Sequence, residues 1–185
     1  MKKAESRDAL CGRRGPGKRY DCMDKEEFTR RLLQSEQMLY RIARTLLSSD
    51  ADCADAVQEA VANAWQHRDT LREEAYFQTW LTRILINACR TQQRRMRRLV
   101  PVAQLPERYE APPPDPGVRE ALFALPPALR LPTVLHYIEG FSLEEIARST
   151  RTPVGTVKYR LYQARRRLRL EIQPDAAMPI GERSR

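Results

Sequence analysis

A run of prolines divides the chain into two parts. The segment from Leu99 to Gly117 contains six prolines, three of them consecutive at 112–114. An α-helix does not continue through such a run, because proline lacks the backbone N–H and its ring clashes with the preceding turn. Consecutive prolines favour an extended polyproline geometry instead. We therefore predict two modules, 23–98 and 118–172, joined by a proline-rich linker over 99–117.

The two ends of the chain lack helical periodicity. Residues 1–22 mix charges with glycine and proline, and 173–185 form a polar tail, so both segments are predicted to be disordered. The amphipathic pattern begins at Met23, which we predict to be the start of the functional domain and a candidate start of translation. Glycine is scarce at 7 residues and aromatic residues make up 7%, which favours helical modules over an all-β fold.

The first module carries apolar residues at helical spacing in three stretches. They predict helices over about 25–47, 51–67 and 75–98, and Ser49 has the chemistry to cap the second of them. Each helix has one apolar face, so the three are expected to pack into a bundle.

The second predicted helix has a polar face that contains three acids. This face stands out because the chain has a net charge of +9 and a pI of about 9.8. It is either a solvated surface, which is the common case, or a docking surface for a partner. Its residues are Asp52, Asp55, Glu59, Asn63 and Gln66.

The third predicted helix has the opposite character. Between Arg83 and Arg98 there is no acid, whereas an ordinary solvent-exposed helix mixes Glu with Arg to form pairs four residues apart. Arginine pairs bidentately with phosphate and stacks on bases, so this pattern favours binding to nucleic acid. The outward stripe consists of Arg83, Asn87, Arg90, Arg94 and Arg97.

The second module begins near Val118 with an apolar helix that extends to Ile138. We predict a kink at Pro132 and a C-terminal cap at Gly140. Ser142 and Glu145 then form a capping box, in which each side chain accepts a hydrogen bond from the other's backbone N–H. The box predicts the start of a short helix.

A turn over 149–151 separates this short helix from a longer basic one. Thr152 and Pro153 supply a predicted N-cap and first-turn proline for the longer helix. A short helix, a turn and a basic helix make up a helix-turn-helix, a DNA-binding motif. An ordinary αα-hairpin is the alternative, but it does not require so many cations on its second helix: Lys158, Arg160, Arg165, Arg166 and Arg167.

Three segments resemble a known family. FSLEEIARSTRTPVGTVKYRLYQARRRLR is similar to the promoter-recognition region of extracytoplasmic-function sigma factors, a subfamily of the sigma-70 family. DADCADAVQEAVANAWQH and FQTWLTRILINACRTQQRR resemble the N-terminal region of the same family. The resemblance covers nearly all of 23–172. It implies an all-α fold with an N-terminal bundle of three to four helices, a sigma region 2, and a C-terminal helix-turn-helix, a sigma region 4.

The resemblance also implies three binding surfaces and assigns residues to each. In the family, the second helix binds a coiled coil of the largest subunits of core RNA polymerase; the matching residues are Asp55, Gln58 and Glu59. The third helix and the loop before it capture and help melt the promoter −10 element; the matching residues are Phe77, Trp80, Arg83, Asn87, Arg90 and Arg94. The C-terminal module recognises the −35 element; the matching residues are Thr152, Gly155, Thr156, Lys158, Tyr159, Arg160, Tyr162, Arg165 and Arg166.

Two positions depart from the family pattern. The turn usually carries apolar residues and a glycine, but here it holds Ser149, Thr150 and Arg151, so either Arg151 adopts the backbone of the turn or the turn differs. Tyr159 stands where a small hydroxyl residue is commoner, which predicts an unusual promoter sequence. Family members are commonly held inactive by an anti-sigma factor, often membrane-bound, and the resemblance implies such a partner in addition to polymerase and promoter DNA.

Other functional classes find less support. A repressor or activator that binds DNA without polymerase is the nearest alternative. It does not explain why the first module carries both the acidic face and the arginine stripe. We expect no enzyme, cofactor or small-molecule substrate, because the chain has no phosphate-binding glycine loop and no nucleophile motif. We also expect no metal site, because no cysteine or histidine ligands are paired at short spacing. No apolar run suits a membrane span or a secretory signal, so the expected compartment is the cytoplasm.

Overall fold

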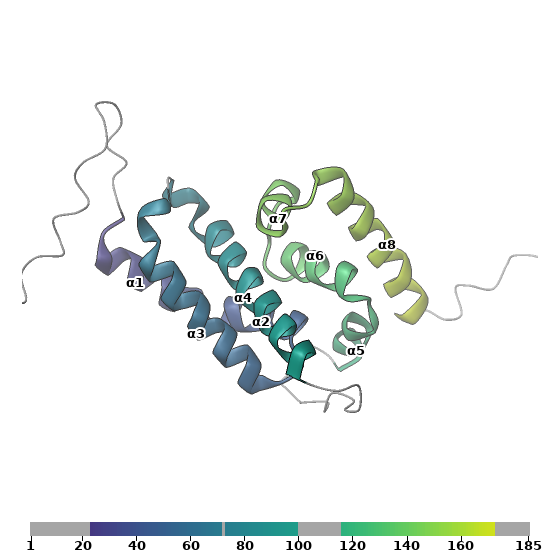
Figure 1. Ribbon diagram of the computed structural model, residues 1–185. Coiled ribbons are helices and arrows are strands. Elements are labelled where there is room, and N and C mark those ends of the chain that lie inside the picture. The colour runs from purple at the N-terminus through teal and green to yellow at the C-terminus, as the bar shows by residue number, and fades with distance from the viewer. Residues whose placement is uncertain (1–22, 72, 100–115, 173–185) are drawn as a thin grey trace, which may run out of the picture.

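The computed structural model describes residues 23–71, 73–99 and 116–172, and these residues contain helices and no strand. The predicted all-α class is confirmed (Figure 1). In chain order the α-helices are α1 (Lys25–Gln34), α2 (Glu36–Leu46), α3 (Asp50–Gln66), α4 (Phe77–Leu99), α5 (Pro116–Ala124), α6 (Pro127–Tyr137), α7 (Leu143–Thr150) and α8 (Val154–Ile172). Two short 3₁₀ turns, η2 (Arg68–Thr70) and η3 (Glu74–Tyr76), lie between α3 and α4.

The helices α1 to α4 form the first module around a core of Leu, Ile, Ala and aromatic side chains. α3 and α4 pack side by side, and α2 packs on both. Phe28, Leu39 and Ile42 are almost completely buried, as their helical spacing predicts. Cys53 on α3 and Cys89 on α4 are also buried, and this burial raises their pKa values to about 11 and about 12. Both therefore serve as small core residues.

One predicted helix is in fact two. The helix expected over 25–47 bends at Ser35, which separates α1 from α2. The hydroxyl of Ser35 donates to the carbonyl oxygen of Arg31 at 2.8 Å, and its backbone N–H donates to both Arg31 and Leu32. A serine side chain that bonds to the preceding turn competes with the regular ladder and bends the helix.

The first helix of the second module is also divided, at a different proline from the one predicted. The break lies at Pro126, where α5 has ended and α6 begins with Pro127 at its first turn. Pro132, the predicted kink, lies buried within the continuous helix α6. Ile138, expected on the apolar face, is 45% exposed because α6 ends one residue earlier.

The predicted signals around the helix-turn-helix are mostly confirmed. Gly140 has a φ of 73°, in the region that glycine adopts most easily, and it ends the α6 segment. The capping box of Ser142 and Glu145 is present in both directions. Thr152 does not cap α8 as predicted, since its hydroxyl bonds to the carbonyl of Thr150 instead.

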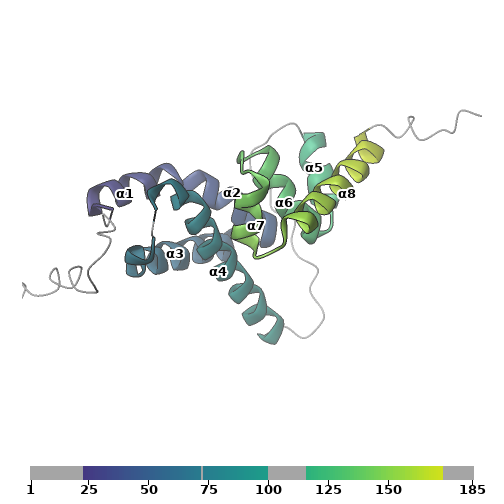
Figure 2. The ribbon, with the colours of Figure 1, turned by 90° about the horizontal axis from the view of Figure 1, so that it is seen from above.

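The two modules are docked against each other. α7 packs on α4 and α6 packs on α2 (Figures 1 and 2). The buried apolar side chains of both modules form one continuous cluster. The core therefore extends across the boundary that the proline-rich segment predicts. The sequence pattern predicts two modules but gives no sign of a contact between them.

The predicted leader 1–22, nearly all of the predicted linker (100–115) and the tail 173–185 lie outside the described residues. The ends of the predicted linker need correction: Leu99 belongs to α4, and Pro116 and Gly117 belong to α5. None of the described helices is long and apolar enough to cross a bilayer.

Candidate nucleic-acid interface

The arginine stripe of α4 is an exposed surface. Arg83, Asn87, Arg90 and Arg94 are all exposed on one side of the helix, whereas Leu81 and Leu85 on the other side are fully buried. Within the described residues, these three arginines form no ion pair. The only hydrogen bond among them runs from Arg94 Nη2 to Thr91 Oγ1, at 3.2 Å. Their guanidinium groups are therefore available for phosphate oxygens.

The two aromatic residues predicted at this surface differ in position. Phe77 is 2% exposed and meets the ring of Phe28 edge-on at 5.5 Å, so it belongs to the core and not to the predicted DNA-contacting set. Trp80 is half-buried, and its indole Nε1 donates to Thr70 Oγ1 at 3.3 Å. The ring centroids of Phe77 and Trp80 lie 6.2 Å apart, so the two rings pack against each other. Aromatic spacing alone did not distinguish these two environments.

A pocket of about 320 Å³ lies between α3, α4 and the turn that joins them. Trp80, Arg83 and Asn87, which the sequence predicts at this surface, all line the pocket. The opposite wall consists of Glu59, Asn63, His67 and Thr70. Glu59 and Asn63 belong to the polar face predicted for the second helix, whereas no sequence pattern indicated His67 or Thr70.

The acidic side of α3 is not a single surface. Asp55 and Gln58 are exposed, but Asp52 accepts a hydrogen bond from Gln92 of α4 at 3.0 Å. Glu59 lies 3.5 Å from the guanidinium of Arg95, also on α4. Two of the three acids thus help to hold α3 against α4, and Asp55 is the acid that remains outward.

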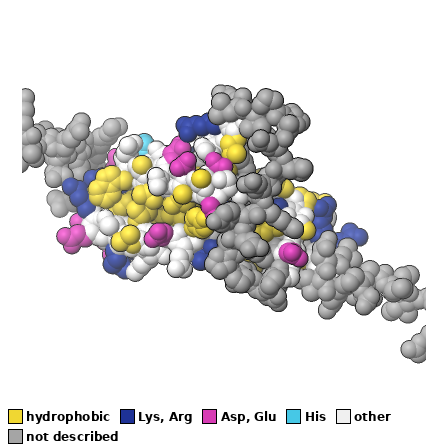
Figure 3. All heavy atoms as spheres, turned by 90° about the horizontal axis from the view of Figure 1, so that it is seen from below, with side chains coloured by type: hydrophobic (Ala, Val, Ile, Leu, Met, Phe, Trp, Pro, Cys, Tyr) yellow, Lys and Arg dark blue, Asp and Glu magenta, His cyan; other side chains and the backbone are white. Residues whose placement is uncertain are grey.

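Apolar side chains form a band across the first module on the face shown in Figure 3, with acidic side chains on both sides of it. The large apolar residues that the first module exposes include Leu33, at 66% exposed, and Trp65, at 40%. Val57 and Val61 of α3 are partly buried against the core. An apolar surface with an acidic rim suits a protein partner better than nucleic acid.

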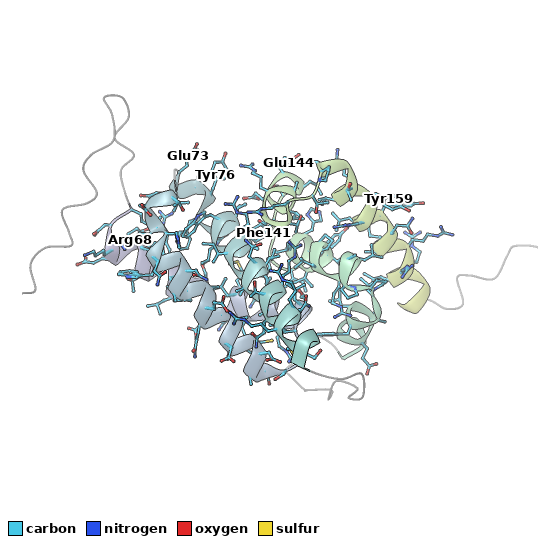
Figure 4. All side chains as sticks on the ribbon, viewed as in Figure 1. Arg68, Glu73, Tyr76, Phe141, Glu144 and Tyr159 are labelled. Carbon is cyan, nitrogen blue, oxygen red and sulfur yellow. The ribbon has the colours of Figure 1, made fainter. Side chains whose placement is uncertain are left out.

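The basic helix α8 packs on α5 and α6 through Val157, Leu161 and Ala164, which are buried. Tyr159 is 61% exposed and Tyr162 is 55% exposed, and Figure 4 shows Tyr159 projecting away from the remainder of the molecule. Among the other residues predicted to contact DNA, Thr152, Thr156 and Arg160 are half-buried, and Gly155, Lys158, Arg165 and Arg166 are exposed.

Polar contacts join the two modules along their seam. Arg41 of α2 donates two hydrogen bonds to Glu139, at 2.7 and 2.8 Å, and the Glu139 side chain is only 4% exposed. Thr79 of α4 donates to Glu145 at 3.3 Å, and its carbonyl accepts from the hydroxyl of Ser149 at 3.2 Å.

Further contacts extend this seam at both ends. The guanidinium of Arg148 on α7 lies 4.5 Å from the ring centroid of Tyr76. Figure 4 shows Tyr76 and Glu144 along the upper edge of the molecule. Arg130 donates to the carbonyl of Thr45 at 3.4 Å from the opposite module. The seam therefore combines a continuous apolar cluster with polar contacts, several of which are buried.

The described residues include no group of three or more His, Cys, Asp or Glu side chains that could hold a metal ion. The surfaces of α4 and α8 instead have the exposed basic and aromatic side chains that nucleic-acid binding requires.

Comparison with known proteins identifies the family. The model for Sigma-70 region 2 matches residues 32–99, and the model for Sigma-70, region 4 matches residues 117–168. The ECF RNA polymerase sigma factor SigM of Mycobacterium tuberculosis is 31% identical over 151 residues, covering 78% of this chain and 76% of SigM. The RNA polymerase sigma-E factor of Streptomyces coelicolor is 33% identical over 162 residues, covering 82% and 88%.

A solved structure supports the same relationship. The sigma factor RpoE of Bartonella quintana, in complex with the anti-sigma factor NepR, matches with a TM-score of 0.67 at 28% identity, covering 81% of this chain and 99% of RpoE. The chain therefore belongs to the extracytoplasmic-function group of sigma-70-type sigma factors, non-enzymatic proteins that bind core RNA polymerase and direct it to particular promoters.

Proposed function

We propose that three surfaces divide the work of this sigma factor. The outward side of α3 binds core polymerase, the α4 surface captures the −10 element, and α8 recognises the −35 element. The observation that carries this proposal is the acid-free arginine surface of α4, which lies on a different module from the exposed tyrosines and cations of α8. We also propose that the chain catalyses no reaction, and that it works in the cytoplasm, where polymerase and promoter DNA are found.

The proposed polymerase-binding surface combines the exposed Asp55 and Gln58 with exposed apolar side chains of the same module. Stable protein interfaces pair an apolar centre with a polar rim, and Trp is enriched among the residues that contribute most to affinity. We therefore add Trp65 and Leu33 to the family-derived residues. Glu59 contributes less directly, since it is already close to Arg95.

The −10 surface combines phosphate contacts with a pocket for a base. Arg83 and Arg90 suit the DNA backbone, while the pocket lined by Asn63, Trp80 and Asn87 offers amide groups and an aromatic surface. Proteins that hold an unpaired base use hydrogen bonds to its edge and stacking on aromatic side chains. We propose that this pocket holds one base of the melted −10 strand.

The −35 surface is the exposed side of α8. Lys158 and Tyr159 lie near the N-terminal end of the helix, which in a helix-turn-helix contacts base edges in the major groove. Arg165 and Arg166 lie further along and suit backbone phosphates. The bulky Tyr159 supports a preference for a base step that offers an apolar contact, such as a thymine methyl.

The docked modules must separate before both elements are bound. The elements lie about 25 base pairs apart, which is roughly 85 Å along straight B-form DNA. Arg151 of the turn and Arg90 of α4 line the same pocket, and α8 begins three residues after Arg151. The 19 residues of α8 extend only about 28 Å. The docked form is therefore too short to contact both elements, and we propose that polymerase binding opens it.

An anti-sigma factor is a further proposed partner. The relative RpoE of Bartonella quintana is bound to the anti-sigma factor NepR in its solved structure. We propose that a protein of this kind also controls the present chain, and that it does so by holding the modules in the docked form.

Co-elution with core polymerase tests the polymerase surface. The full chain is expected to elute with bacterial core RNA polymerase in size-exclusion chromatography at near-equal stoichiometry. The double variant Asp55→Ala, Gln58→Ala should lose this co-elution, while the control Glu144→Ala, an exposed acid on the other module, should retain it. If the folded wild-type chain does not co-elute, a stand-alone DNA-binding regulator becomes the better account.

A further inference from the structure

A second pocket lies on the seam between the two modules. Its volume is about 460 Å³, and α4 and the turn after α7 line it together. From α4 come Asn87, Arg90, Thr91, Gln93 and Arg94, and from the other module comes Arg151. Pockets of this size commonly hold small organic ligands. The pocket depends on docking, because one of its arginines comes from the opposite module.

The charges in this pocket are not balanced. Of the residues that the structure describes, three arginines line it and no carboxylate does. Among the described residues, Arg90 and Arg151 form no ion pair or side-chain hydrogen bond, and Arg94 donates only to Thr91. Like charges held together at a seam repel each other, so the docked form gains stability when an anion neutralises them. Gln93, half-buried in the wall, donates to the carbonyl of Leu46 and fixes that side of the pocket.

The backbone at Arg151 provides a separate observation. Arg151 has φ 54° and ψ 46°, the left-handed conformation, and it is the only non-glycine residue with positive φ in the described part of the chain. Helices that end in this conformation usually place glycine there, because other L-residues are strained. The chain thus has a strained arginine at the position where glycine would be easiest, and this residue lines the pocket together with residues of α4.

We propose that this pocket binds a small anion with two or more phosphate groups, either a free nucleotide or an inorganic polyphosphate. Guanidinium groups from both modules pair with its phosphate oxygens and hold the modules together. Asn87 and Gln93 supply side-chain amides beside them. The anion therefore stabilises the docked form of the sigma factor.

This site also gives the anion a regulatory effect, which rests on the proposed function of α4. Arg90 and Arg94 belong to the surface proposed for the −10 element, so a bound anion and the promoter strand compete for the same two side chains. A ligand that binds only the docked form also shifts the population away from the open form that two-element recognition requires.

Inorganic pyrophosphate is the probe for a direct test on the full chain, with ionic strength held constant by sodium chloride. Thermal unfolding should shift upward with pyrophosphate, and calorimetry should give one site per chain. Arg151→Gly is the decisive variant. Without the anion it should raise the melting temperature by about 2–4 °C, because it relieves the left-handed strain. It should also weaken pyrophosphate binding about tenfold or more, since one charge-assisted pair is lost.

Arg165→Ala on α8 serves as the matched control, because it removes an exposed arginine that is remote from the pocket wall. It should leave pyrophosphate binding unchanged. Parallel titrations with ADP and with a single-stranded oligonucleotide separate the sources of phosphate: a free anion prefers the wild-type pocket, whereas DNA binding should persist in Arg151→Gly. If Arg151→Gly and wild type bind pyrophosphate equally, or if Arg165→Ala weakens binding as much, the proposal is wrong.

Promoter-directed transcription with core polymerase distinguishes this proposal from that of the α4 surface. Arg151→Gly should transcribe as well as wild type without pyrophosphate and should resist inhibition by it. A variant that loses pyrophosphate binding but transcribes normally supports the site. Normal transcription after removal of Arg83, which does not line this pocket, would instead contradict the proposed −10 surface and leave the anion site intact.

Discussion

The two basic surfaces of this sigma factor differ in their relation to the seam. The α4 surface runs beside it, so Arg90 and Arg94 share a pocket with Arg151 of the other module. The α8 surface points away from it, with Tyr159 projecting outward (Figure 4). Docking therefore restricts the surface proposed for the −10 element and leaves the surface proposed for the −35 element accessible. If both proposals hold, the docked form can contact the −35 element but not capture the −10 strand.

The two surfaces also differ in chemistry. α4 offers arginines and amides with one half-buried tryptophan, a set suited to backbone phosphates and an unpaired base. α8 offers two exposed tyrosines among its cations, a set suited to the edges of paired bases and the phosphates around them. The two surfaces are both positively charged, but their side chains suit two different modes of DNA recognition.

The largest expected effect comes from the α4 surface. The triple variant Arg83→Ala, Asn87→Ala, Arg90→Ala removes exposed side chains and no buried contact. Each lost DNA contact costs about 1–3 kcal/mol, so promoter-directed transcription should fall about 100-fold or more. Permanganate footprinting should detect the loss of the melted −10 strand, while co-elution with polymerase remains normal. Loss of polymerase binding would mean that α4 serves the partner and not the promoter.

A smaller effect is expected from α8. The double variant Lys158→Ala, Tyr159→Ala should lower the preference for the cognate −35 element by about 10- to 100-fold. Strand opening on a promoter with a strengthened −10 element should be almost unaffected, because α4 is intact. Competition transcription between promoters that differ only in the −35 element measures this preference. An equal loss on both promoters would remove the distinction between the two surfaces.

The seam should respond to a single charge reversal. Arg41→Glu places a second carboxylate against Glu139, whose side chain is 4% exposed. Because Arg41 itself is about half exposed, solvent screens part of the effect, and we expect docking to weaken by about 1–2 kcal/mol. Energy transfer between dyes on α3 and α8 should report a longer mean distance. The charge swap Arg41→Glu, Glu139→Arg should restore the wild-type distance, and failure to do so would attribute the change to another cause.

The smallest effect concerns acid stability. Burial raises the pKa of Glu145, but hydrogen bonds from the backbone and hydroxyl of Ser142 and from Thr79 outweigh it, so the pKa of Glu145 is lowered overall. A carboxyl group with a lowered pKa contributes stability above its unfolded pKa of 4.5, and this contribution is lost as the pH falls through the folded value. Unfolding by urea at pH 7 and at pH 3 should show a loss of about 1 kcal/mol at the lower pH that is absent in Glu145→Gln. Equal pH dependence in the variant would show that other groups are responsible.

Local signals predicted local structure well. The capping box at Ser142, the turn at Gly140 and the exposed stripe from Arg83 to Arg94 each depend on residues close together in the chain, and each is present. The family resemblance also led to the correct fold class. The sequence contains a signal for the break at Pro126, because two consecutive prolines follow Leu125. The kink predicted at the isolated Pro132 was wrong, since α6 continues through it.

Features that depend on tertiary packing could not be predicted from such local signals. Phe77 and Trp80 lie three residues apart on α4, and the ring of Phe28 packs edge-on against both. The fold nevertheless buries Phe77 almost completely and leaves Trp80 half-buried. The pocket between α3 and α4 depends on Thr70, which lies in a turn without periodicity. The docking of α7 on α4 joins residues such as Thr79 and Ser149, 70 positions apart. No local pattern encodes such a contact.

Because the two modules are covalently connected, the contacts at their seam need only a weak intrinsic affinity to keep the modules docked. Two binding surfaces on one chain meet at an effective concentration in the millimolar range when the connecting segment is short. A seam with an intrinsic dissociation constant near 1 mM, only about −4 kcal/mol, would then leave the modules together about half of the time. The few polar contacts around Glu139 and Thr79 are therefore enough to matter. Any partner that separates the modules therefore competes with an intramolecular contact, whose effective concentration does not fall on dilution.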